Sequence, residues 1–479
     1  MGVPTAYGPS TPVDSRLVDR SLAHVRPRSF WLDSTPDPDG TSSRGSDASG
    51  LRHADLIVVG GGYTGLWAAL QAKERDPSRT VVLLEAVTIA WAASGRNGGF
   101  CDASLTHGDE NGKRHFADDL DTLKRLGLEN FSAMRDTIER YGIDAEWEDV
   151  GMLQVATEPH QIAFIEELAA DNGEVFLDAE ATRALVDSPL YRAGVHLREG
   201  ISLVHPVKLA QGLRRACESL GVEIHEHTRA TGLRRSGDGS MVVQTDAGEY
   251  TAPRVALATN GFRSLVRRAD FLVVPVYDYA LMTEPLSAEQ LGRIGWQGRQ
   301  GIGDSSRQFH YYRLSADNRV LFGGYDAIYH RGGRIRNSQD QRPATFRLLA
   351  DHFFRTFPQL DDVDFSHAWG GAIDMSTKLV AHISTAYGGQ VAYAAGYTGL
   401  GVASTRVGAQ TMLDLLDGRD TELTQMPMAR KLPFPIPPEP IAYPAIQVAR
   451  AAVARSDENG GRDGLLLRAM GAFGIGFDT

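Results

Sequence analysis

The feature that most constrains this chain is a glycine-rich turn between an apolar strand and a helix, followed by a second apolar strand. Leu56–Val59 is expected to be a strand, and Gly60-Gly61-Gly62-Tyr63-Thr64-Gly65 follows it directly. A helical run occupies 66–75, and a second strand, Val81–Leu84, ends at Glu85, about 20 residues past the glycines. This order of elements predicts a dinucleotide-binding βαβ unit.

Each residue type in this unit has a physical role at a pyrophosphate. Gly60 permits the tight turn, Gly62 lets the backbone approach the pyrophosphate, and Gly65 lets helix and strand pack closely. The start of the helix offers free N–H groups and the positive end of its dipole to the phosphates. Glu85 is suited to accept hydrogen bonds from ribose hydroxyls. The residues expected to bind the dinucleotide here are Gly60, Gly62, Tyr63, Thr64, Gly65 and Glu85; a tight turn without a ligand is the alternative.

A second motif indicates which dinucleotide is bound. The sequence Trp91-Ala92-Ala93-Ser94-Gly95-Arg96-Asn97-Gly98-Gly99-Phe100 follows Glu85. A small, glycine-rich loop with an arginine suits a chain that passes along a flavin, and a nicotinamide enzyme has no need of it. On these motifs the chain resembles the FAD-dependent D-amino-acid oxidase superfamily of amine oxidoreductases. The likeness is to its glycine oxidase, sarcosine oxidase and γ-glutamylputrescine oxidase group and covers roughly residues 28–420.

The resemblance implies an α/β fold with two domains, which suits 479 residues at roughly 100–200 residues per domain. One is a glutathione-reductase-like FAD-binding domain, discontinuous in sequence, and the other is a substrate domain built on an antiparallel sheet. We expect the FAD-binding domain to comprise 51–115, 200–270 and 366–420, and the substrate domain to comprise 116–199 and 271–365. Residues 1–50 are then an N-terminal extension and linker, and 421–479 are a C-terminal tail.

The resemblance also implies further contacts with FAD. Arg96 has a planar fork that suits a phosphate, and the helix start after Leu400 would point at the flavin, where its dipole stabilises negative charge. A surface-loop arginine and an ordinary glycine-rich turn are the alternatives. The additional residues expected to bind the cofactor are Ser94, Arg96, Asn97, Gly98, Gly99, Thr259, Asn260, Gly396, Thr398, Gly399, Leu400 and Gly401. Neither Cys101 nor Cys217 lies in the C-terminal third, where monomeric sarcosine oxidases link their flavin, so non-covalent FAD is expected.

Candidate substrate contacts come from two alternating segments, 272–283 and 308–325, which read as long antiparallel strands. Asp317-Asn318 marks a hairpin turn in the second. Aromatic walls suit an amine, because a cation binds over a ring face. The candidate catalytic residues are Tyr279, His310, Tyr312, Arg313 and Trp369, with Tyr277 and Tyr325 beside them. Core aromatic residues are the alternative.

Three candidates carry further alternatives. Arg313 is a candidate anchor for a substrate carboxylate, although strict alternation places it opposite Tyr312 on the strand. His107 and His205 are either pocket residues or structural histidines, and Asp278 and Asp374 are equally open. Lys378 is the sequence candidate for activating dioxygen near the flavin, as a lysine does in some relatives.

Composition excludes several classes of protein. There are 49 Lys and Arg against 60 Asp and Glu, giving a net charge of −11 and a pI of about 5.7, which argues against nucleic-acid binding. The chain lacks a run of apolar residues long enough to span a membrane. Two cysteines predict no disulfide framework and fit a cytoplasmic location. Cysteine and histidine arrays for a metal, a P-loop and a nucleophile elbow are lacking, so neither a metal site nor a hydrolase is expected.

The expected function is therefore oxidation of the C–N bond of an amine or amino acid to an imine, with hydride passing to flavin N5. Hydrolysis then gives a carbonyl compound and an amine, and dioxygen or another acceptor re-oxidises the flavin. An FAD-dependent dehydrogenase of a 2-hydroxy acid or another C–O substrate is one alternative. A structural flavin-binding protein and an NAD-dependent dehydrogenase are the others. The sequence fixes neither the amine nor the oligomeric state.

Overall fold

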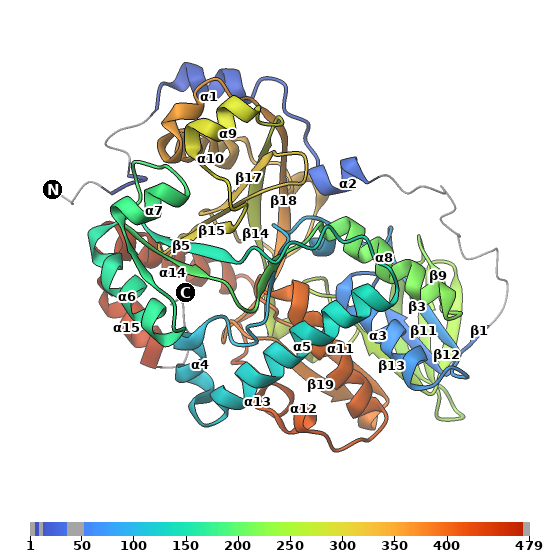
Figure 1. The fold of residues 1–479 in the computed structure, drawn as a ribbon. Coiled ribbons are helices and arrows are strands. Elements are labelled where there is room, and N and C mark those ends of the chain that lie inside the picture. The colour runs from blue at the N-terminus through green and yellow to red at the C-terminus, as the bar shows by residue number, and fades with distance from the viewer. Residues whose placement is uncertain (1–4, 9–12, 36–51, 473–479) are drawn as a thin grey trace.

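The computed structural model describes residues 5–8, 13–35 and 52–472 (Figure 1). From residue 36 onwards, the expected N-terminal linker lies outside the described residues. Two large sheets dominate the fold, with the nucleotide-binding elements in the lower half of Figure 1 and the larger sheet in the upper half. Within the described residues, no helix has the length and apolar character needed to cross a membrane.

The lower half is built on a six-stranded sheet. Its strands, in spatial order, are β19 (His382–Ala386), β20 (Val391–Ala395), β13 (Arg254–Leu257), β2 (Leu56–Val59), β3 (Val81–Leu84) and β9 (Glu223–His225). All neighbours pair in parallel except β19 and β20. The central strands β2 and β3 are buried along their whole length, because helices cover one face and a second sheet covers the other.

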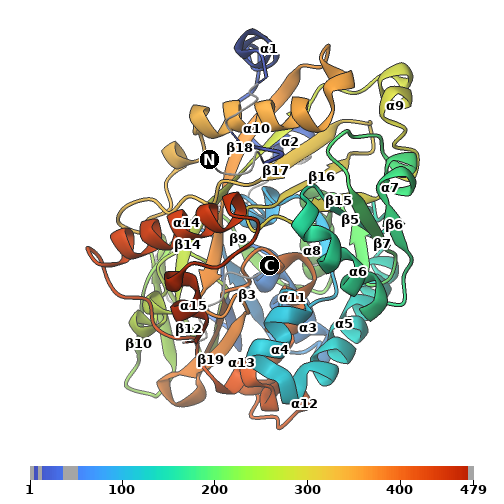
Figure 2. The ribbon, with the colours of Figure 1, turned by 90° about the vertical axis from the view of Figure 1, so that its left-hand side faces the viewer.

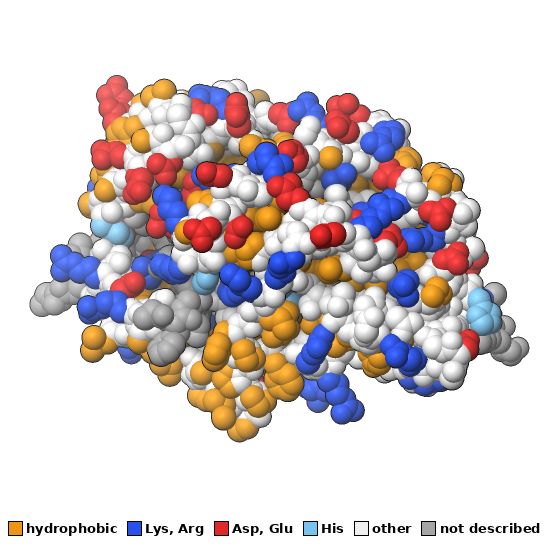
Figure 3. Space-filling model, turned by 90° about the horizontal axis from the view of Figure 1, so that it is seen from below, with side chains coloured by type: hydrophobic (Ala, Val, Ile, Leu, Met, Phe, Trp, Pro, Cys, Tyr) orange, Lys and Arg blue, Asp and Glu red, His pale blue; other side chains and the backbone are white. Residues whose placement is uncertain are grey.

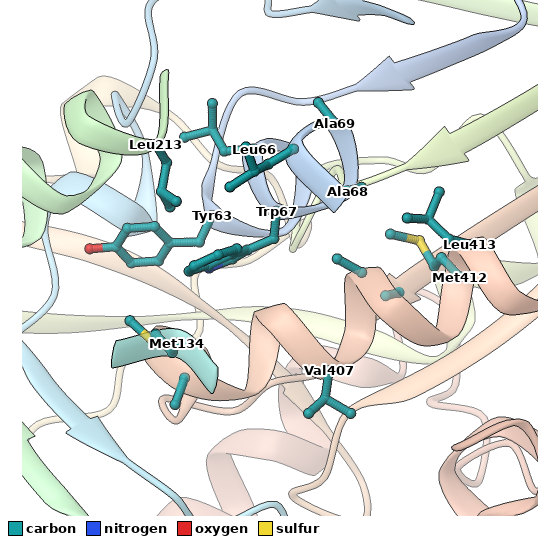
Figure 4. Close-up of a cluster of buried hydrophobic side chains, with 14 of the residues drawn as sticks. Tyr63, Leu66, Trp67, Ala68, Ala69, Met134, Leu213, Val407, Met412 and Leu413 are labelled. Atoms are coloured by element: carbon teal, nitrogen blue, oxygen red, sulfur yellow. The ribbon is translucent and has the colours of Figure 1, made fainter. Parts of the chain in front are cut away.

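One face of this sheet packs against helices. The covering helices are α3 (Tyr63–Arg75), α5 (Leu120–Arg140), α8 (Pro206–Ser219) and α11 (Gly401–Leu416). Figure 4 shows Leu66 and Trp67 of α3 beside α11, which carries Val407 and Leu413 of the same buried cluster. The other face packs against a four-stranded sheet ordered β1 (Arg52–His53), β12 (Gly248–Ala252), β11 (Met241–Thr245) and β10 (Ala230–Arg235).

The upper half contains an eight-stranded sheet. Its order is β18 (Phe365–Ser376), β14 (Val273–Thr283), β17 (Val320–Gly324), β16 (His310–Leu314), β15 (Gly301–Asp304), β5 (Met152–Ala156), β7 (Ala193–Leu197) and β6 (Phe176–Asp178). Its neighbours pair antiparallel apart from β15 and β5. Helix α10 (Pro343–Thr356) packs against this sheet. A two-stranded ribbon, β4 (Phe100–Asp102) with β8 (Ile201–Leu203), completes the strands.

Further helices lie in both halves of the molecule. The remaining α-helices are α1 (Ser15–Ser21), α2 (Phe30–Ser34), α4 (Asp109–Phe116), α6 (Ile162–Asp171), α7 (Ala179–Leu185), α9 (Ala288–Ile294), α12 (Glu422–Gln425), α13 (Pro427–Arg430), α14 (Ala442–Glu458) and α15 (Leu465–Ala472). On the face seen from below, acidic and basic side chains are interspersed and hydrophobic side chains gather at one edge (Figure 3).

The predicted fold class is confirmed: the molecule is α/β, and its six-stranded sheet is assembled from separate segments of the chain. A tighter turn at 117–119 separates α4 from α5. One detail differs from expectation. Strand β18, expected within the FAD-binding segments, pairs along its length with β14 in the eight-stranded sheet. We therefore propose that the substrate domain includes Phe365–Ser376.

Candidate active site

A single cavity of about 1270 Å³ runs between the two halves of the molecule. The glycine turn and the loop after β3 line one end, and strands β14, β16 and β18 line the other. The residues expected to bind the cofactor that line it are Gly60, Gly62, Tyr63, Thr64, Glu85, Ser94, Arg96, Asn97, Gly98, Thr259, Asn260, Thr398, Gly399, Leu400 and Gly401. Gly65, Gly99 and Gly396 do not line the cavity and pack behind its wall.

The glycine turn has the geometry that close backbone packing requires. Gly60 adopts a φ of 113°, a conformation that favours glycine, and a Cβ there would collide with the carbonyl of Ala258. A Cβ on Gly65 would collide with the Gly60 carbonyl, so α3 lies as close to β2 as a glycine allows. Gly62 caps α3 without a side-chain hydrogen bond, the N–H of Tyr63 donates to the Ser94 hydroxyl at 3.0 Å, and this helix start lines the cavity.

Glu85 is held at the end of β3 by backbone donors. Its carboxylate oxygens accept hydrogen bonds from the N–H groups of Gly61, at 2.6 Å, and Val87, at 2.8 Å. Burial raises the pKa of Glu85, and these two backbone donors lower it. A carboxylate has about four acceptor positions, so Glu85 retains capacity for ribose hydroxyls.

The loop after β3 is fixed by its own polar side chains. Asn97 donates to the carbonyls of Ala93 and Ser94 and accepts from the N–H of Gly99 at 2.9 Å. Arg96 pairs with Asp340 at 2.5 Å and also donates to main-chain carbonyls. The Arg96 guanidinium thus links this loop to the substrate half, in addition to lining the cavity where a phosphate contact was expected.

A second helix start opens on the same cavity. The turn before α11 contains Gly396, Thr398 and Gly399, all with positive φ, and Leu400 caps the helix without a side-chain hydrogen bond. The buried carboxylate of Asp374 accepts from the N–H of Gly396 at 2.6 Å and fixes this turn. Two uncapped helix starts facing one elongated cavity fit a ligand with a pyrophosphate and a ring that becomes anionic, which is the chemistry of FAD.

Strand β14 lines the cavity mainly with the face opposite to the one expected. Along β14, Val276, Asp278 and Ala280 alternate as cavity residues. The rings of Tyr277 and Tyr279 share one face, as alternation predicts, with centroids 6.2 Å apart, but this face is directed at α10, where Tyr279 contacts Phe346. Tyr279 is among the residues lining the cavity, and its hydroxyl donates to the Gln339 carbonyl at 2.8 Å.

Strand β16 shows the same reversal. Tyr311 lines the cavity, whereas His310 and Tyr312 do not. His310 is fully buried between Asp304, 2.6 Å from its Nδ1, and His352 of α10. The hydroxyl of Tyr312 lies 2.7 Å from that of Tyr191, so both residues belong to the core on the α10 side.

Arg313 is a structural arginine in this fold. As expected, it lies on the opposite side of β16 from Tyr312, yet it does not line the cavity. Its fully buried guanidinium donates to the carbonyls of Gly99 and Val204, at 3.2 and 2.7 Å, and lies over the Trp31 ring. These contacts join β16 to Gly99, at the end of the loop after β3, so Arg313 is not placed to anchor a substrate carboxylate.

The other aromatic candidates lie at the cavity. Trp369 lines it, and its indole N–H donates to the Arg96 carbonyl at 2.9 Å. Tyr325 also lines it, with its ring stacked 5.1 Å from that of His310. His107 is a cavity residue whose Nε2 lies 3.1 Å from the carbonyl of Thr398.

Two further candidates lie away from the cavity. His205 caps α8, where its Nδ1 accepts from the N–H of Lys208, and burial lowers the pKa of His205 to about 3. Lys378 does not line the cavity; burial lowers the pKa of its ammonium group, and Lys431 adds to this effect.

The chemically distinctive group in the cavity is a half-buried pair of an acid and a phenol, Asp278 and Tyr311. Asp278 accepts a hydrogen bond of 2.5 Å from the Tyr311 hydroxyl and another of 2.8 Å from the N–H of Tyr279. Burial raises the pKa of Asp278 to about 6, and its hydrogen bond with Tyr311 opposes this shift. The Tyr311 ring packs against Gly98, where a Cβ would stand 2.6 Å from it, so the pair lies beside the flavin loop.

Neither Tyr311 nor the C-terminal helix was predicted from the sequence to be part of the site. Tyr311 would have been a candidate if the other set of alternating residues along β16 had been assigned to the cavity. Ile446, Arg450 and Val453 of α14 line the cavity as well, and no local pattern in the C-terminal segment indicates this.

Comparisons with known proteins agree with this site. A family model described as FAD dependent oxidoreductase matches residues 55–415. Gamma-glutamylputrescine oxidoreductase of Escherichia coli (strain K12) is 31% identical over 397 residues, which cover 80% of this chain and 88% of that protein. Sarcosine oxidase subunit beta of Rhizobium meliloti is 26% identical over 340 residues, covering 68% of this chain and 75% of that protein.

Solved structures share the fold. The crystal structure of glycine oxidase from Geobacillus kaustophilus superposes with a TM-score of 0.65 at 18% identity, covering 79% of this chain and 98% of that one. The matched range of the family model includes the glycine turn and both helix starts. The chain therefore belongs to the family of FAD-dependent oxidoreductases, related to the amine and amino-acid oxidases.

Proposed function

We propose that this enzyme oxidises the C–N bond of an amine or amino acid to an imine, which water then hydrolyses to a carbonyl compound and a released amine. The observation that supports this most strongly is the half-buried carboxylate of Asp278 in the cavity wall, beside the loop that we expect to contact the flavin. When bound, FAD supplies the hydride acceptor.

Asp278 matches the charge of an amine substrate. An amine arrives as a cation, and a carboxylate in a partly desolvated wall attracts it more strongly than one in water. Each oxygen of Asp278 already accepts one hydrogen bond, from Tyr311 or from the N–H of Tyr279, and each retains acceptor capacity for a substrate N–H.

Aromatic rings complete this wall. Tyr311 has Phe100 and Phe309 beside it, with ring centroids 5.8 and 6.4 Å away, and all three residues line the cavity. Ring faces attract cations, so this wall favours the ammonium form on binding. Hydride leaves only an uncharged amine, and Asp278 is the acceptor to which the substrate proton passes.

The same carboxylate argues against the C–O alternative. A 2-hydroxy acid has no ammonium group for Asp278 to bind, and Arg313 is bonded to backbone carbonyls outside the cavity. The carboxylate of Asp278 therefore favours an amine over a hydroxy acid.

Anaerobic reduction of the flavin by a substrate panel tests this proposal. The panel pairs primary amines, N-methyl amines and amino acids with the alcohols and 2-hydroxy acids of the same carbon skeleton. We expect the visible absorbance of the flavin to be lost with amines alone, and the carbonyl product to form in equal amount. Reduction by hydroxy acids and by none of the amines would overturn the proposal, and reduction by dithionite alone would indicate a structural flavin.

A further inference from the structure

The C-terminal helix α14 forms part of the cavity wall. Ile446, Arg450 and Val453 line the cavity, and their spacing places them on one face of the helix. Figure 2 shows α14, in red, at mid-height between the two halves of the molecule. The matched family region ends at residue 415, so α14 lies outside it.

An ion cluster holds Arg450 at the wall. Its Nη2 lies 2.7 Å from Asp326, whose carboxylate also accepts from Arg342 at 2.8 Å and from the Thr345 hydroxyl at 2.9 Å. The Arg450 Nη1 donates to the side-chain oxygen of Gln447 at 3.1 Å. Arg450 is thereby oriented, and its side chain remains 33% exposed.

A second contact ties α14 to the loop before β16. The carboxylate of Asp457 accepts from the N–H groups of Arg307 and Gln308, at 3.1 and 3.0 Å. Arg307 also pairs with Asp463 at 2.7 Å. Gln308 and Phe309 line the cavity, so the position of α14 determines the shape of this part of the wall.

The charges around Arg450 favour an anionic ligand group. One carboxylate, Asp326, faces the guanidinium groups of Arg342 and Arg450, which leaves this cluster with one excess positive charge. A guanidinium has five N–H donors, and the hydrogen bonds to Asp326 and Gln447 use only part of those of Arg450. The planar fork of an arginine binds a carboxylate through two parallel hydrogen bonds.

We propose that Arg450 binds a carboxylate at the non-reacting end of the substrate, so that the C-terminal helix selects substrates by length and charge. This inference rests on the proposed amine oxidation, because it concerns the other end of the same substrate. Asp278 and Arg450 line one continuous cavity, and they give it a cation-binding and an anion-binding group.

Hexanoate and hexanamide test this directly, because they match in length, differ in charge and carry no amine to oxidise. Each is titrated into the FAD-loaded protein, and binding is followed by the change in the visible flavin spectrum. We expect hexanoate to bind more tightly, and Arg450→Gln to weaken hexanoate about 10- to 100-fold while leaving hexanamide unchanged. Arg450→Lys retains the charge without the fork and should retain part of the affinity.

Arg455→Gln is the matched control, because Arg455 is exposed on the same helix and does not line the cavity. It should leave both affinities unchanged, and equal FAD content in all variants confirms folding. Equal binding of hexanoate and hexanamide by the unaltered protein, or equal loss of both in Arg450→Gln, would overturn the inference. Neither probe is oxidised, so this result stands apart from whether an amine reduces the flavin.

Discussion

At the scale of single residues, Asp278 determines how the site responds to pH. Burial raises the pKa of Asp278 to about 6, so its carboxylate is ionised at neutral pH and protonated in mild acid. Asp374 also lines the cavity, and burial raises its pKa to about 6. Asp326, which does not line the cavity, adds negative charge near Asp278. Arg96 is paired with Asp340, and burial lowers the pKa of His107.

The Asp278→Asn variant distinguishes the titration of Asp278 from that of the other groups. In the unaltered enzyme, the rate of anaerobic flavin reduction at low amine concentration should fall as the pH decreases through about 6, because the protonated acid no longer binds the ammonium group. The Asn variant should lack this fall and react roughly 100-fold more slowly at neutral pH. A variant that keeps the same pH profile would assign it to another group, with Asp374 next to be tested.

Tyr311→Phe tests the partner of this acid. The hydrogen bond from Tyr311 lowers the pKa of Asp278, so its loss should raise that pKa and move the fall in rate to higher pH. Tyr312→Phe is the matched control on the same strand, because its hydroxyl bonds to Tyr191 on the α10 side. The rate of flavin reduction is measured by stopped flow as a function of pH for both variants. Equal pH profiles for the two would contradict the assigned role of Tyr311.

At the scale of elements, the βαβ unit depends on a close contact between α3 and β2. Gly65→Ala places a methyl group against the carbonyl of Gly60 and should force the helix away from the strand, with loss of FAD affinity and a lower melting temperature. Gly292→Ala in α9 has open space around its Cβ and should leave both unchanged or slightly improve stability. Flavin fluorescence and thermal unfolding measure the two effects, and full FAD binding by Gly65→Ala would contradict the packing argument.

The elements could be predicted to different extents from the sequence. The unit around Gly60–Gly65 is specified by local spacing, and the hairpin of β16 and β17 forms around the predicted Asp317-Asn318 turn. Alternation correctly grouped Tyr277 with Tyr279, but it could not choose which face lines the cavity. One face of β14 and β16 packs against α10, and the other face lies toward the cavity. Both faces therefore carry large buried side chains.

At the scale of the whole molecule, segments remote in sequence complete the site. Near the N-terminus, Trp31 of α2 is fully buried and donates to the carbonyl of Asn97 at 2.9 Å, which supports the flavin loop. Near the C-terminus, α14 closes the far end of the cavity. Such contacts depend on tertiary packing and leave no periodic signal, which is why the sequence predicted the cofactor end better than the substrate end.

Breaking of the bond between hydrogen and the carbon next to an amine nitrogen is the step that defines the proposed enzyme. Anaerobic stopped-flow reduction of the bound flavin by an amine, and by the same amine deuterated at that carbon, tests it. We expect complete reduction, slower with the deuterated amine, with one carbonyl product formed per flavin. Reduction at equal rates by the two forms, or by the matching 2-hydroxy acid alone, would contradict it.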